Sequence, residues 1–125
     1  MTSGRSKSEE IAVSVPFLDR TVELTLSQVG KDLLLRIAGG DKPHIGAVAL
    51  AQPYPKGDRM TASASVLCAY GHREAELAQE AARLLAKKHG VIVSCVCGVH
   101  FKDIKPEQIP ELVARILEEV ELLSF

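Results

Sequence analysis

The sequence predicts an α+β domain in which five strands come first, followed by a helix, a sixth strand and a second helix. Three observations lead to this order. Apolar and polar residues alternate in short segments up to residue 69, as in half-buried strands. Residues 72–89 are rich in Ala, Leu, Glu and Lys, which are strong helix formers. Apolar residues near the C-terminus recur at helical spacing. Because consecutive strands favour antiparallel pairing, we expect sheet layers that are mostly antiparallel.

The five early strands are separated by residues that favour turns. A Gly-Lys pair at 30–31 precedes the third strand, and a Gly-Gly pair at 39–40 ends it. The prolines at 53 and 55 end the fourth strand, because proline cannot donate a hydrogen bond to a sheet. The predicted strands span residues 11–17, 21–29, 32–38, 44–51 and 61–69.

The later part of the chain changes character. The segment HREAELAQEAARLLAKKH (72–89) is predicted to be a helix that stops at Gly90. The following segment, VIVSCVC (91–97), is continuously apolar or β-branched except at its serine, which predicts a strand covered on both faces. The last helix lies around residues 109–123 and accepts Pro110 in its first turn. The helix at 72–89 also allows the strand that follows it to run parallel to the strand before it, through a right-handed crossover.

Length and composition fit a single soluble domain. We place this domain at residues 9–125, behind a polar tail at 1–8 that we expect to be disordered. A net charge of −1 and 4% aromatic residues give little basis for nucleic-acid binding. No apolar run reaches the roughly 18 residues of a membrane span, and the first residues do not resemble a signal peptide. A cytoplasmic protein is therefore expected.

The three cysteines point to a reducing compartment. Their number is odd, and two of them, Cys95 and Cys97, lie on one predicted strand. Residues two apart on a strand point the same way, which leaves a shared metal role open. Packing in an apolar core is the favoured interpretation.

Three of the four histidines lie at the ends of predicted elements. His44, His72 and His100 each have a glycine within two positions, and glycine permits close approach of a ligand or another backbone. If the elements adjoin, three imidazoles would suit Zn, Cu, Ni or Fe. Each histidine alone is better explained by an ordinary structural position, and only the three together point to a shared site. The fourth, His89, has a sufficient role at a helix C-terminus.

The start of the predicted helix at 72 is a candidate anion site. Its first-turn amides point past Gly71, and Arg73 adds a positive charge. Thr61 and Ser63 offer hydroxyl groups on one face of the preceding strand, although a solvated strand face explains them as well. Glu74 opposes this hypothesis, because a carboxylate in the first turn can occupy the same amides.

Four stretches together resemble one known family. HIGAVALAQP (44–53), TASASVL (61–67), GHREAELA (71–78) and GVHFKDI (98–104) look like the LpdD-like family of prenylated-flavin chaperones, over residues 30–120. This family accompanies UbiD-type aromatic acid decarboxylases and is similar in fold to proteasome-assembly chaperones. The chain departs from the expected pattern at Lys102, where a small acidic or amide residue is typical.

The resemblance implies a non-catalytic carrier that holds prenylated FMN, or FMN, for a UbiD-type decarboxylase. His44, His72 and His100 then become metal ligands or groups that face the flavin phosphate. Together with the anion site, the expected cofactor-binding residues are His44, Thr61, Ser63, Gly71, His72, Arg73 and His100. A homodimer is also predicted, because the apolar stripe at 109–123 is wide and pairing would supply more pocket wall.

Two alternatives stay open. The first is a protein-assembly chaperone or interaction module without a small ligand. The second is a small metal-dependent enzyme, which is less favoured because the only carboxylates near the histidines are Glu74 and Asp103. A catalytic Ser-His-Asp order, a phosphate-binding P-loop and a dinucleotide fingerprint are all missing from the sequence.

Overall fold

The computed structural model describes residues 9–69 and 74–125. Its elements are β1 (Glu10–Phe17), β2 (Arg20–Val29), β3 (Asp32–Gly40), β4 (Ala47–Lys56), β5 (Arg59–Cys68), α1 (Ala75–His89), β6 (Val93–His100), a 3-10 turn η1 (Pro106–Gln108) and α2 (Ile109–Leu122). The predicted α+β class and the order of strands and helices are confirmed. Across the described ranges, no helix is long and apolar enough to cross a membrane.

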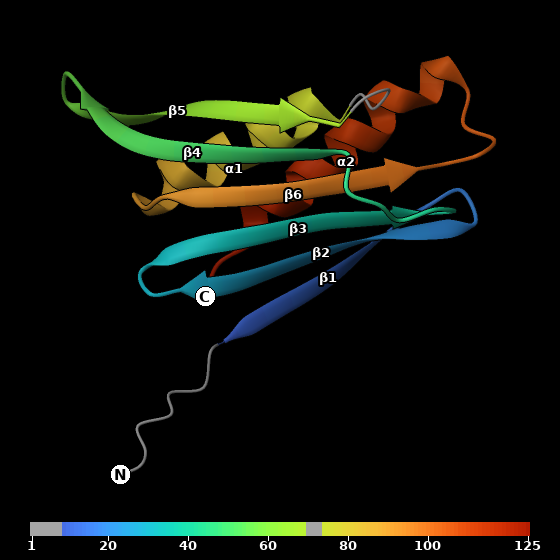
Figure 1. Cartoon of the computed structure of the whole chain (residues 1–125), viewed down its shortest axis with the longest axis horizontal. Coiled ribbons are helices and arrows are strands. Elements are labelled where there is room, and N and C mark those ends of the chain that lie inside the picture. Colours follow the sequence, from blue (N-terminus) through green and yellow to red (C-terminus); the bar gives the residue numbers. More distant parts are fainter. Residues whose placement is uncertain (1–8, 70–73) are drawn as a thin grey trace, which may run out of the picture.

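The strands form one mixed sheet in the order β1-β2-β3-β6-β4-β5 (Figure 1). β6 lies between β3 and β4, parallel to β3 and antiparallel to β4. All other neighbours pair antiparallel. β5 and β6 are both antiparallel to β4, so β6 runs parallel to β5. The connection from β5 through α1 to β6 is therefore the parallel return that the predicted helix allowed.

Both helices cover the same face of the sheet, and Figure 1 shows them behind it. α1 packs against β4, β5 and β6, while α2 packs against α1 and β1. Within a single chain, therefore, the helices cover one face of β6 and not both faces as predicted. Val93, Cys95 and Cys97 are fully buried under the helices, whereas Ser94 and Val96 point the other way and are half-buried. We call the face that neither helix covers the open face.

β4 differs from the prediction at both ends. It begins at Ala47, so His44 lies in the preceding loop, and it continues through both prolines to Lys56. β6 pairs with β4 only from Ala47 to Ala51. Beyond that point only β5 flanks the strand, and proline is tolerated where one side of a strand needs no hydrogen bond.

The helix ends follow local signals. α1 stops at Gly90, whose left-handed conformation (φ 67°) lets its N–H donate to the carbonyl of Ala86 at 2.8 Å. The predicted start at residue 72 lies outside the described residues. α2 has its proline in the first turn, and its stripe of Leu112, Ile116 and Val120 is buried inside the domain. That stripe covers the chain's own sheet, so the predicted homodimer needs another surface.

Candidate functional site

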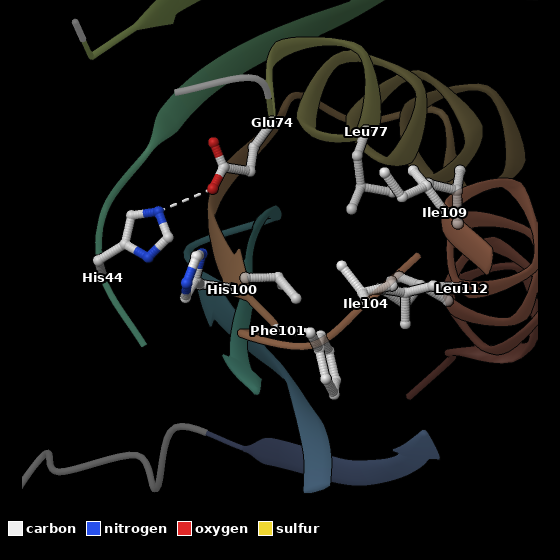
Figure 2. Close-up of a pocket in the computed structure, with 11 residues that line it drawn as sticks. His44, Glu74, Leu77, His100, Phe101, Ile104, Ile109 and Leu112 are labelled. Atoms are coloured by element: carbon white, nitrogen blue, oxygen red, sulfur yellow. Dashed lines mark hydrogen bonds and ion pairs between the residues drawn. The ribbon is translucent and has the colours of Figure 1, made fainter. Parts of the chain in front are cut away.

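A cavity of about 340 Å³ lies between the C-terminal end of β6, the start of α1 and helix α2. Most of its wall is aliphatic or aromatic, and three polar side chains gather on one side of it (Figure 2). The polar residues are His44, Glu74 and His100. The apolar ones are Leu77, Val99, Phe101, Ile104, Ile109, Leu112, Val113 and Ile116. An apolar cavity with a few convergent polar groups is the usual form of a small-molecule site.

His44 is held through both of its ring nitrogens. Nδ1 lies 2.9 Å from the carbonyl oxygen of Lys42, and Nε2 lies 2.7 Å from Oε1 of Glu74. A carbonyl only accepts hydrogen bonds, so Nδ1 carries a proton and donates it. Nε2 and Oε1 are within hydrogen-bond distance, so the two side chains form a polar pair. The pair ties the loop before β4 to the start of α1.

Glu74 plays a different part from the one expected for it. It occupies the N-cap position of α1, but its side chain makes no capping hydrogen bond within the described helix. Its carboxyl group points instead to His44 (Figure 2). Within the described residues, this carboxyl group contacts His44 rather than a first-turn amide of α1. The physical reason is that an imidazole donor lies within reach of Oε1.

Two glycines permit this arrangement. A methyl group on Gly98 would overlap the carbonyl of His44, and one on Gly46 would overlap the carboxyl group of Glu74. The N–H of Gly46 donates to the carbonyl of Cys97 at 2.8 Å, which anchors the loop along β6. Glycine does allow close approach at both positions, as the sequence suggested. The groups that approach are the protein's own backbone and carboxyl group.

His100 is the last residue of β6, and its backbone is fixed by the loop after β3. The N–H of Asp41 donates to the carbonyl of His100 at 2.7 Å. The backbone N–H of Lys102 donates in turn to the carboxylate of Asp41 at 3.0 Å, and this bond is the main reason why the pKa of Asp41 is lowered. Arg20 adds an ion pair to Asp41 at 2.9 Å. The side chain of His100 is exposed and lines the cavity.

The structure thus brings two of the three predicted histidines, His44 and His100, to one cavity. His72, with Gly71 and Arg73, lies outside the described residues. Thr61 and Ser63 are on β5, where they pair with the far half of β4, and neither lines the cavity. The assignment of these residues to a cofactor site stays a prediction.

The three-histidine metal site is also still a prediction. Among residues 9–69 and 74–125, no group of three or more His, Cys, Asp or Glu side chains could hold a metal ion. His44 would have to exchange one of its two hydrogen bonds for a metal bond.

Sequence reasoning missed most of the cavity wall. The wall residues of α2, such as Val113 and Ile116, belong to the apolar stripe that was recognised only by its helical spacing. Ile104 comes from the connection before this helix. Phe101 is the aromatic residue of the wall, and its ring is already packed edge-on against Phe17 at 5.6 Å. The available signal was that a helical stripe begins shortly after a histidine-bearing strand.

Cys95 and Cys97 pack in the core, as favoured above. Both are fully buried, and burial raises the pKa of Cys97 to about 12 and that of Cys95 well above its ordinary value. Both thiols are therefore protonated at neutral pH and are inert toward disulfide reagents.

We expect one thiol per native chain to react with a soluble aromatic disulfide reagent, and all three to react after unfolding in guanidinium chloride. The reactive thiol should be that of Cys68, which is exposed. Absorbance of the released thiolate measures the count. A Cys68→Ala variant with no fast-reacting thiol confirms the assignment, and rapid reaction of two or more native thiols would contradict it.

Comparison with known proteins gives two positive results. The sequence matches the family described as prenylated flavin chaperone LpdD-like domain over residues 18–124. The structure resembles a chain in the crystal structure of a chaperone complex for yeast 20S proteasome assembly, with a TM-score of 0.61. The two sequences are 8% identical, and the likeness covers 90% of this chain and 91% of that one. Both resemblances inferred from the sequence motifs are thereby confirmed. Comparison with curated proteins gave no match.

Proposed function

This chain belongs to the family of prenylated flavin chaperone LpdD-like domains, and we propose that it is a non-catalytic carrier of prenylated FMN. The flavin binds in the cavity beneath His44 and His100 and passes from there to a UbiD-type aromatic acid decarboxylase. The observation that supports this proposal is the combination of an apolar wall with two histidines on one side of one cavity. The carrier works as a homodimer.

The distribution of polar groups suggests how the ligand lies. The apolar part of a prenylated flavin fits against the aliphatic wall of α2, because burial there removes apolar surface from water. The phosphate belongs at the polar side, where the exposed His100 can donate a hydrogen bond. His72 and Arg73 precede Glu74 in the sequence and would add donors at this end.

The size of the cavity favours carriage over chemistry. Ligand pockets usually measure about 300–1,000 Å³, and this one, at about 340 Å³, is near the lower limit. A flavin nucleotide would therefore keep part of its surface outside the protein. Such partial burial suits a carrier, because the exposed part of the ligand is accessible to the enzyme that receives it.

The fixed ring of His44 fits the same role. Its two hydrogen bonds hold the imidazole in one orientation, so the ring gives the cavity a defined polar edge. Glu74 acts through His44 as a positioning residue.

The test is to purify the chain together with a flavin prenyltransferase and to record its visible spectrum and bound flavin per chain. Wild-type protein should carry flavin, and His100→Ala should bind it about 10-fold to 100-fold more weakly, because a hydrogen bond to a charged phosphate is lost. His44→Ala should weaken binding similarly. His89→Ala is the matched control, because His89 contacts the carbonyl of Leu123 at 3.2 Å and does not line the cavity.

Two outcomes would contradict the carrier function. Wild-type protein without any flavin would favour the interaction module, and full binding by His100→Ala would place the ligand elsewhere. Elemental analysis of the same samples tests whether a divalent Zn, Ni, Fe or Cu accompanies the flavin. Transfer is checked by adding loaded carrier to cofactor-free decarboxylase and following the appearance of activity.

A further inference from the structure

The open face carries a group of exposed apolar side chains over β4, β5 and β6. Leu67 is 80% exposed and Leu50 is 55% exposed. Val48 pairs with Leu67 on one side and with Val96 on the other, so these three side chains form a row across the strands. Soluble monomers rarely leave a large contiguous apolar patch uncovered, and such patches usually mark an interface.

The polarity of the side chains on this face suits contact with a second copy of the chain. In the middle of β4, β5 and β6, the side chains on the open face are either apolar or carry neutral hydroxyl and amide groups. They are Val48, Leu50, Gln52, Ser63, Ser65, Leu67, Ser94 and Val96, and none of them is ionisable. A two-fold interface buries the same patch on both copies, and a patch without ionisable side chains can be buried without leaving an unpaired charge. We infer that the open face binds the open face of a second copy of this chain.

Shape supports a second copy as well. A hollow of about 320 Å³ lies on the open face, lined by Arg36, Ile37, Ala38, Pro43, His44, Ile45 and Val96. It lies in the same cross-strand row as Leu67, because Leu67 pairs with Val48, Val48 with Val96, and Val96 with Arg36. A protruding leucine and a hollow on one face can fill each other reciprocally across a two-fold axis.

This pairing fixes the position of the axis. Leu67 on β5 of one copy has to lie over the hollow at β3 and β6 of the other copy. This arrangement requires a two-fold axis that runs along the strands, between β4 and β6. Strands of the two copies would then be nearly aligned, which is one of the two common ways for sheets to pack face to face. In the next row, the same axis places Leu50 over the small Ser94 of the second copy.

The sequence of β6 gives an independent reason. Its apolar pattern predicts burial on both faces, yet one chain covers only the face of Val93, Cys95 and Cys97. The opposite side, with Ser94 and Val96, is half-buried. A second sheet on the open face would supply the missing coverage.

Sedimentation equilibrium of the full chain tests the inference. Wild-type protein should have twice the mass of one chain at tens of micromolar. Leu67→Lys should raise the dimer dissociation constant about 100-fold or more, because each dimer would bury two unpaired charges. Leu122→Lys is the matched control, since Leu122 is 73% exposed but lies on α2 and should leave the dimer unchanged.

Leu50→Lys provides a second variant at the centre of the face, and far-UV circular dichroism checks that each variant is folded. A wild-type protein that sediments as one chain at 100 μM would overturn the inference. So would a dimer that survives both Leu67→Lys and Leu50→Lys in folded protein. None of these outcomes depends on flavin binding, because the measurements use protein without added ligand.

Discussion

Replacing Val113 with tryptophan should abolish flavin binding while leaving the fold intact. Val113 is half-buried on α2 and lines the cavity, so a larger side chain at this position occupies the space proposed for the ligand. We expect affinity for FMN or prenylated FMN to fall at least about 100-fold, because the ligand loses its apolar contacts and would have to displace the indole. The visible spectrum of co-purified protein and a fluorescence titration measure the loss.

The chain has no other tryptophan, so the new side chain reports on its own surroundings. A blue-shifted emission shows that the indole fills the cavity. Val29→Trp is the matched control, since Val29 is 62% exposed on β2 and should give red-shifted emission and normal binding. Undiminished flavin binding by Val113→Trp with a blue-shifted emission would exclude this cavity as the site.

Replacing Gly98 with alanine should destabilise the protein by roughly 3 kcal/mol or more. The added methyl group would overlap the backbone carbonyl of His44, which a change of rotamer cannot move away. Either β6 or the loop before β4 has to shift, and the hydrogen bond from Gly46 to Cys97 is then lost. Chemical denaturation with circular dichroism measures the free energy of unfolding.

Gly57→Ala separates this overlap from ordinary backbone strain. Gly57 has a φ of +65° and no atom within 4 Å of an added methyl group, so only left-handed strain of about 1–2 kcal/mol is expected. If Gly98→Ala proved as mild as Gly57→Ala, the close packing of His44 on β6 would be refuted. A folded Gly98→Ala protein should also bind flavin poorly, because His44 is displaced.

Local patterns predicted the elements well, because strand alternation and helix propensity are encoded within short windows. They did not predict that β6 inserts between β3 and β4, since pairing partners depend on contacts that are distant in the sequence. The same difficulty explains the error at Pro53. Proline normally ends a strand, but β4 lacks a neighbour on one side there, and the local sequence does not contain that information.

The candidate site was predicted only in part for a related reason. His44 and His100 were identified because glycines and strand ends mark places where ligands approach. The contact between Glu74 and His44 joins residues 30 positions apart, so it depends on the tertiary fold. The apolar stripe of α2 was recognised from its helical spacing, and it is buried inside the domain. The first half of the same helix, from Ile109 to Ile116, also forms part of the cavity wall, which spacing alone does not show.

His44 lines both the cavity and the hollow on the open face. Under the two proposals above, it therefore contacts a flavin on one side and a second copy of the chain on the other. The two binding equilibria are then linked. If bound flavin changes the affinity between two chains by some factor, pairing of the chains changes the affinity for flavin by the same factor. If this factor exceeds one, the affinity for flavin rises with protein concentration. Dilution would then release the cargo without any chemical step.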